Sequence, residues 1–476
     1  MKHVLMIAHS FPPEGNVGTF RTLRFVRQLP NYGWSPKIVS VRPIQYERFN
    51  PGLSSSIPPG TEVVRVKGHD LWQAFQAWRS RRLREAPCTE RTNRLQEKGV
   101  QQLHNGFRQR LRDMARAIEA SWYHPDMAMP WIANAVDATV EICKRLPIKV
   151  LWATAAPLSS FYIAQRSSSR ADIPYVLDFR DPWTISCSDF ERIRPAWAIR
   201  RDRQRMHDLL RGAQAVVFRH ATEAECFWRA YPRALEARKI HLIPNGFEGQ
   251  VQKFIPPAEE KRTILYTGTL SSYRFSTLLD AVALLKQTEP SLVKHLCFRF
   301  VGEGSQLLQK EAVERGIAEF VEARDPVPQS ELPSLYSQSH ALLVLGREPA
   351  IKGYELLVGA KLFEYLKTGC PIIGVVPYDE TRQVLERVGV KTIADADSPH
   401  QIAQLIRHFM DQWSNRKLAA LLPDRKACEA YSSEPQTAAL VRALEGLPAE
   451  QAFVPGTHDI PSSLRDTIGP NGWLDD

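Results

Sequence analysis

The sequence predicts an α/β protein built from two doubly wound, Rossmann-like domains. A short apolar run, Val4 to Ala8, precedes a loop rich in turn-forming residues and then a helical pattern. The order of strand, glycine turn and helix starts again at Thr263 to Gly268. A later helix is stopped by Gly369, and the apolar run Ile372 to Val376 follows it as a buried parallel strand.

Further apolar runs of strand length complete both predicted sheets. In chain order these are residues 36–41, 63–66, 150–154, 174–179, 213–218, 241–243, 296–301, 320–321 and 341–345. Residues 249–262 are polar and contain proline, which predicts a domain boundary. We therefore expect a first domain over 1–248, a second over 249–450 and a polar tail over 451–476.

The composition is that of a soluble globular protein, with 43% hydrophobic and 24% charged residues among 476. No apolar run reaches the length of a membrane span, and the first seven residues are too short and too polar for a signal peptide, so we expect a cytoplasmic protein. The seven cysteines are odd in number and lack metal-ligand spacing, which predicts free thiols and no metal site.

Most of the net charge of +10 lies in one segment. Arg65 to Arg116 holds 13 Lys/Arg and 5 Asp/Glu, an excess of +8, which predicts a helical basic insertion at about 67–122 in the first domain. Residues 71–84 place tryptophans beside arginines, so they either lie on an anionic membrane surface or form a helical hairpin with solvated charges. No nucleic-acid module surrounds them, so we expect no nucleic-acid partner.

Two stretches of the first half carry candidate site residues. Gly15 and Gly18, after the first strand, would let the backbone approach a ligand, although any glycine loop in such a domain is similar. Their spacing is not the GxGxxG of dinucleotide-binding proteins, which disfavours a nicotinamide dehydrogenase. Asp178, Arg180 and Asp181 crowd the end of a buried strand, where they either face a ligand or pair with each other.

In the second half, Lys361 and Glu364 share a face at the start of the helix that Gly369 ends. A phosphate could bind the lysine and the helix N-terminus, while the glutamate accepts hydrogen bonds from sugar hydroxyls. An ordinary surface pair on an amphipathic helix is the alternative.

The stretch AKLFEYLKTGCPII resembles the donor-binding motif of the retaining GT-B glycosyltransferases that use nucleotide sugars. Further stretches resemble that family in order over about residues 1–450: FPPEGNVGTFR, DFRDPW, IPNGFE and FRFVGEGS. The resemblance implies the GT-B fold, with the donor on the second domain and the acceptor on the first.

The resemblance also implies residue roles. Glu364 would bind the nucleotide ribose, and Asp181 would position or deprotonate the acceptor hydroxyl together with Asp178 and Arg180. The other donor-binding residues implied are Gly15, Gly18, Gly268, Arg274, Lys361 and Leu362. The chain departs from the family at Leu356, where a second glutamate is usual, and at Thr269, where an arginine is usual.

The function expected from this resemblance is sugar transfer from a nucleotide diphosphate-sugar to a glycan or lipid-linked saccharide, in cell-surface polysaccharide synthesis. The resemblance implies that the anomeric configuration is retained and that the reaction needs neither a metal nor a cofactor. Two alternatives remain open: a sugar-nucleotide epimerase of the same architecture, and an inactive nucleotide-sugar-binding subunit, which Leu356 and Thr269 suggest.

Overall fold

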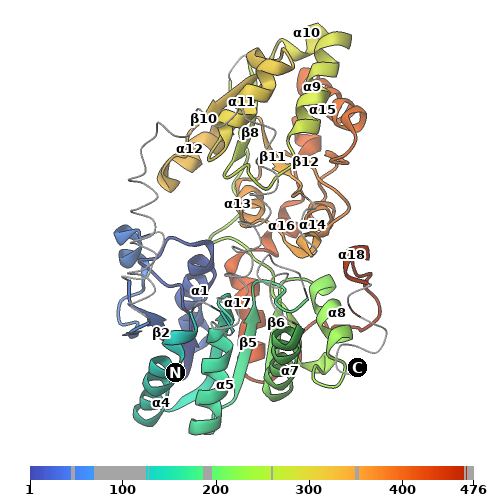
Figure 1. Cartoon of the computed structure of the whole chain (residues 1–476). Helices are drawn as coiled ribbons and strands as arrows, with labels where there is room; N and C mark the ends of the chain where they lie inside the picture. Colours follow the sequence, from blue (N-terminus) through green and yellow to red (C-terminus); the bar gives the residue numbers. More distant parts are fainter. Residues whose placement is uncertain are drawn as a thin grey trace, which may run out of the picture. The chain divides into compact units, whose positions relative to one another are not determined.

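The computed structural model describes residues 1–43, 49–68, 125–126, 128–185, 196–258, 261–348, 353–465 and 468. The chain divides into two compact units, Met1–Ile243 with Thr437–Asp476, and Pro244–Gln436 (Figure 1). The predicted basic insertion lies outside the described residues from position 69 onward, and so does the segment 71–84 with its two interpretations.

The first unit contains a seven-stranded sheet in the order β3-β2-β1-β4-β5-β6-β7, in which every pairing is parallel. Its strands are β1 (Lys2–Ile7), β2 (Trp34–Val41), β3 (Val63–Val66), β4 (Ile148–Ala155), β5 (Tyr175–Phe179), β6 (Ala215–Phe218) and β7 (Ile240–Leu242). The chain order reverses between β1 and β4, which is where open α/β sheets bind ligands.

Helices cover this sheet on both faces, as buried parallel strands require. They are α1 (Val17–Gln28), α4 (Ile132–Arg145), α5 (Ser159–Ala171), α7 (Ala196–Gly212), α8 (Ala221–Ala230), α17 (Ser433–Leu444) and α18 (Ser462–Arg465). Figure 1 shows α4, α5 and α7 beside one another, in agreement with their contacts. On one face, Leu440, Ala443 and Leu444 of α17 join the core formed by β1 and β4.

The second unit contains a six-stranded sheet, again parallel at every pairing, in the order β10-β9-β8-β11-β12-β13. Its strands are β8 (Arg262–Thr267), β9 (Leu296–Val301), β10 (Val321–Arg324), β11 (Ala341–Leu345), β12 (Ile372–Val375) and β13 (Ile393–Ala394). Its helices are α9 (Ser276–Thr288), α10 (Pro290–Val293), α11 (Ser305–Glu314), α12 (Leu332–Ser337), α13 (Ala360–Thr368), α14 (Glu380–Arg387), α15 (Pro399–Ser414) and α16 (Arg425–Glu429).

Alternate residues of these strands enter two separate cores. In β8, Ile264 and Tyr266 pack into the core that contains α9 and α15, whereas Leu265 packs into the core that contains α13. Both faces of the sheet are therefore buried, which confirms the predicted α/β class with two Rossmann-like units.

The division of the chain differs from the predicted ranges at two places. The first unit ends at Ile243 rather than at 248, and it regains the chain from Thr437 onward because α17 fills its core. The predicted polar tail also contributes buried apolar side chains, namely Phe453, Ile460 and Leu464. The backbone N–H of Gly456 donates to both carboxylate oxygens of Glu225 on α8, at 2.9 and 3.1 Å. Burial and hydrogen bonding thus hold this segment on the first unit.

Candidate active site

The glycine turn after β8 lies directly against a lysine that is far away in the sequence. Gly268 has φ +115°, and a methyl group built on it would clash with Lys361 Nζ. The ammonium group donates to the Tyr266 hydroxyl at 2.9 Å, which in turn donates to the Thr269 carbonyl at 2.8 Å. Only glycine can combine this backbone conformation with so close a side chain.

Helix α13 brings Lys361 to this turn because its sequence sets both its ends and its buried face. Gly359 occupies the N-cap position, and Gly369 ends the helix with φ 64°. Leu362, Phe363, Tyr365 and Leu366 are buried, whereas Glu364 is exposed on the opposite face. The predicted helix and its glycine stop are confirmed.

A small pocket opens at this place. Lys361 Nζ lies 4.2 Å from the ring centroid of Tyr266 and 5.0 Å from that of Tyr273. Burial lowers the pKa of Lys361 to about 7, and the positive charge of Arg347 contributes to this. The pocket is lined by Tyr266, Tyr273, Leu343, Val344, Leu345, Arg347, Leu357, Gly359, Lys361, Leu362, Tyr365 and Thr381.

Glu364 lies beside a group of hydroxyls at the edge of the same region. The Thr267 N–H donates to the Tyr365 hydroxyl at 2.9 Å, and the Thr267 hydroxyl lies 3.5 Å from that of Tyr336. Burial raises the pKa of Tyr336, and the negative charge of Glu364 contributes to this. An exposed carboxylate beside hydroxyls can accept hydrogen bonds from a diol.

Arg274, predicted to bind phosphate, has carboxylate partners of its own. It forms an ion pair with Asp397, and its Nε lies 3.7 Å from Glu348. Its backbone N–H donates to Gly346 at 2.9 Å. The loop arginine is thus compensated, and it does not line the pocket with Lys361.

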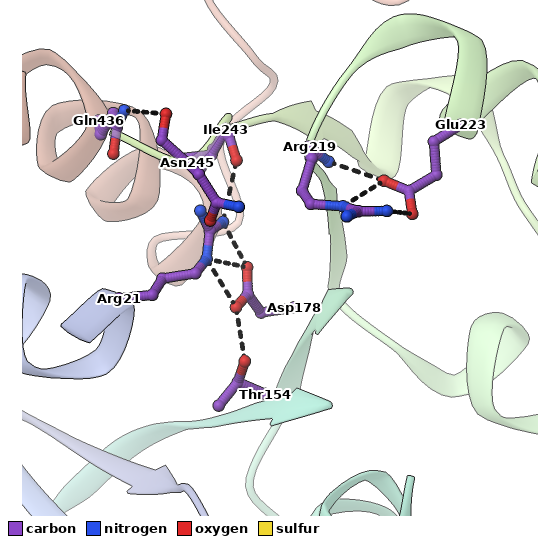
Figure 2. A network of polar contacts seen from close by, with 8 residues as sticks. All are labelled: Arg21, Thr154, Asp178, Arg219, Glu223, Ile243, Asn245 and Gln436. Atoms are coloured by element: carbon purple, nitrogen blue, oxygen red, sulfur yellow. Dashed lines mark hydrogen bonds and ion pairs between the residues drawn. The ribbon is translucent and has the colours of Figure 1, made fainter. Parts of the chain in front are cut away.

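In the first unit, Asp178 is fully buried and lies in a hydrogen-bond network (Figure 2). Arg21 donates to its carboxylate through Nε at 3.0 Å and Nη2 at 2.7 Å, and Thr154 donates at 2.8 Å. Arg21 also donates to the Ile243 carbonyl at 2.9 Å. This arrangement leaves Asp178 no exposed surface for a substrate.

Arg180 and Asp181 follow β5 and lie differently from Asp178. The Arg180 guanidinium donates to the Ala156 carbonyl and covers Gly18 so closely that a methyl group there would overlap it. Asp181 is exposed. Gly15 is half-buried in the same loop as Gly18, between β1 and α1. The structure therefore brings Gly18 and Arg180 together and leaves Asp181 accessible.

Sequence reasoning missed His9 and the Arg219/Glu223 pair. His9 follows β1, its ring lies edge-on to Trp131 at 5.3 Å, and burial together with the Arg180 charge lowers its pKa to about 4. Arg219 Nη2 donates to Glu223 at 2.7 Å, as Figure 2 shows. The position of His9 directly after a central strand was a usable signal.

Among the described residues, no three His, Cys, Asp or Glu side chains are grouped as metal ligands. Within the same part of the chain, no helix combines the length and the apolar composition of a membrane span.

Residues 249–422 match the family model described as glycosyl transferases group 1. The chain carries a group 1 glycosyltransferase domain. A search of curated protein sequences finds no significant match to this chain.

Several solved structures share the GT-B fold of this chain. A glycosyltransferase from Rickettsia africae ESF-5 is 13% identical, with 93% of this chain and 98% of that chain covered, at a TM-score of 0.59. WaaG, a glycosyltransferase involved in lipopolysaccharide biosynthesis, is 12% identical, with 92% and 99% covered, at a TM-score of 0.51. A mutant of S. aureus TarM, in complex with fondaparinux, α-GlcNAc-glycerol and UDP, is 10% identical, with 93% and 100% covered, at a TM-score of 0.57. Such low identities establish the fold alone.

Proposed function

We propose that this glycosyltransferase moves a sugar from a nucleotide diphosphate-sugar to a glycan or lipid-linked saccharide acceptor. The observation that carries the proposal is the close approach of Lys361, which lines the pocket, to the glycine turn at Gly268, within the domain that matches the family. A glycine turn at the carboxyl end of a parallel strand, beside a cation and a helix N-terminus, suits a diphosphate. TarM, which has the same fold, was crystallised with UDP.

In this proposal, the second unit binds the donor. Lys361 pairs with the diphosphate, and Leu362 forms part of the apolar wall of the pocket. Glu364, which is exposed beside Tyr336, accepts hydrogen bonds from the ribose hydroxyls.

The first unit would bind the acceptor, with Asp181 as the group that contacts it. The acceptor oxygen bonds to the anomeric carbon on the same face from which the diphosphate departs, as the bond from that carbon to the diphosphate breaks, so that the configuration is retained. The hydroxyl proton passes to Asp181, and the nucleoside diphosphate leaves. Retention of anomeric configuration is supported by the family resemblance, and the side-chain cations would stabilise the leaving group without a resident metal ion.

The proposal extends to the biological setting. Synthesis of a cell-surface polysaccharide, at the cytoplasmic face of a membrane, is suggested by WaaG, which has the same fold and is involved in lipopolysaccharide biosynthesis. Flotation of the protein with anionic liposomes would test the membrane part. Trp72→Ala/Trp78→Ala should weaken flotation, and unchanged flotation would reject the interfacial helix.

The function is tested first by thermal shift with UDP, GDP, ADP and their sugars. Glu364→Ala should abolish the shift that the wild type shows, because the ribose loses its acceptor. Glu314→Ala on α11, another exposed glutamate, should leave the shift unchanged. If both variants keep the thermal shift, Glu364 does not bind the ribose.

The second test is a product assay with the sugar nucleotide that binds. A glycosyltransferase forms nucleoside diphosphate and a glycosylated acceptor in equal amounts, and Asp181→Asn should lower that rate at least tenfold. Release of an epimerised sugar without an acceptor would indicate the epimerase instead. Binding without turnover on cell-derived acceptors would indicate the inactive subunit.

A further inference from the structure

Two cationic side chains share the pocket beside α13. Arg347 follows β11, Lys361 lies in the first turn of α13, and both line the pocket. Within the described residues, neither forms an ion pair with a carboxylate, and Lys361 is hydrogen-bonded only to the Tyr266 hydroxyl. A pair of uncompensated cations in a partly buried site is costly unless an anion joins it.

Arg347 is held by aromatic rings rather than by polar groups. Its Cζ lies 5.4 Å from the ring centroid of Tyr273 and 5.7 Å from that of Tyr354. Its Nε is buried and has no hydrogen-bond partner in the part of the chain that the structure describes. The backbone is fixed by an antiparallel bridge to Tyr273. The guanidinium is therefore preorganised, with N–H groups left to donate.

Lys361 and Arg347 both lie close to the ring of Tyr273. Lys361 Nζ is 5.0 Å from the Tyr273 centroid, compared with 5.4 Å for Arg347 Cζ. After burial, the charge of Arg347 is the second cause of the low pKa of Lys361, so the cations are close enough to repel. An anion bound to both would remove this repulsion and replace the lost hydration.

The start of α13 adds to the positive potential at the same place. Gly359 provides no side-chain cap, the first turn contains no acidic residue, and Gly359 itself lines the pocket. No side chain therefore competes with an anion for the N-terminus of this nine-residue helix, although the Leu362 N–H donates to the Gly359 carbonyl at 3.1 Å.

We propose that Arg347 and Lys361 together bind the diphosphate of the donor, while Arg274 holds its loop through Asp397 and Glu348. This inference rests on the proposed function, because the diphosphate is part of the proposed donor. Arginine forks onto two phosphate oxygens and lysine binds as a point charge, so the two side chains suit a group with two phosphates.

The test is calorimetric titration of the full chain with UDP, GDP and ADP, and with the matching nucleoside monophosphates. Arg347→Met should weaken the binding of the preferred diphosphate at least tenfold and the monophosphate less, which reduces the preference for two phosphates. Arg347→Lys, which keeps the positive charge, should lose less diphosphate affinity than Arg347→Met does. Arg407→Met is the matched control, because it removes an arginine of α15 that is paired with Glu289, and it should bind as the wild type does.

Arg274→Met tests the alternative in which Arg274, rather than Arg347, binds the diphosphate. We expect it to lose less affinity than Arg347→Met, with both variants shown to be folded by their thermal melting. If the wild type binds a diphosphate, and Arg347→Met binds equally well or Arg274→Met loses more, the inference is overturned. If the wild type binds none of the three diphosphates, the donor proposal itself fails.

Discussion

In the pocket of the second unit, the charge on Lys361 changes near neutral pH. A lysine with a pKa of about 7 is mostly protonated at pH 6 and mostly neutral at pH 8. A diphosphate binds the protonated form, so its binding is coupled to proton uptake.

Diphosphate affinity should therefore fall as the pH rises from 6.5 to 8.5, by roughly tenfold per pH unit above the pKa. Lys361→Arg should bind with little pH dependence over this range, because arginine stays charged. Titration calorimetry in two buffers of different ionisation enthalpy would show the proton uptake. A flat pH profile in the wild type would contradict the assignment.

Metal removal tests where the positive charge comes from. If Lys361 and its neighbours neutralise the leaving diphosphate, treatment with EDTA should leave the transfer rate unchanged within about twofold. A loss of activity that Mg²⁺ restores would contradict this.

The buried Arg21/Asp178 pair makes a prediction about stability. Asp178→Ala leaves a guanidinium that is 3% exposed without its carboxylate, so the free energy of unfolding should fall by about 3–5 kcal/mol. Asp137→Ala, which breaks the exposed pair with Arg170, should cost less than about 1 kcal/mol. Equal losses in urea unfolding would show that Asp178 has no special role.

At the scale of elements, the junction of the β8 turn with α13 decides where Lys361 lies. Gly268→Ala introduces a methyl group at φ +115° against Lys361 Nζ, so it should displace the lysine and weaken diphosphate binding at least tenfold. Gly316→Ala is the control, because its φ is also positive but its methyl group would meet no atom within 4 Å. It should cost about 1 kcal/mol of stability and leave binding intact.

Local sequence patterns predicted the helices and strands well, but they did not predict the contacts between residues that are far apart in the sequence. The strand at 296–301 and the stop at Gly369 depend on neighbouring residues, and both are confirmed. Arg274 meets Asp397 from 123 positions away, and Arg347 reaches Tyr273 through an isolated bridge, so no periodicity indicates either contact. Local sequence therefore assigned Lys361 to the phosphate, whereas it placed Arg347 only in a loop expected near the sugar.

At the scale of the whole molecule, the first unit is made from both ends of the chain. Leu440 and Ala443 are fully buried in the core that begins with β1. The predicted range 249–450 included this helix in the second domain, because an amphipathic pattern does not identify the partner of a helix. The resemblance of residues 437–444 to the family helix that crosses back to the first domain did point to this return.

A fragment of residues 1–243 should therefore lack a cooperative thermal transition, whereas 1–243 joined by a flexible linker to 437–476 should regain one. Residues 244–436 alone should melt cooperatively, because both of their cores are internal. Circular dichroism melting measures all three. A stable 1–243 fragment would show that α17 is dispensable.

The return of α17 to the first unit also sets the order in which the two units can fold during synthesis. Residues 244–436 emerge complete while the earlier sheet still lacks its last helix, so the half that would bind the nucleotide can fold first. The opening strands, although synthesised earlier, keep one apolar face uncovered until α17 has been synthesised. Mutations in α17 should therefore increase the dependence of the protein on chaperones during expression more than mutations in α13 do.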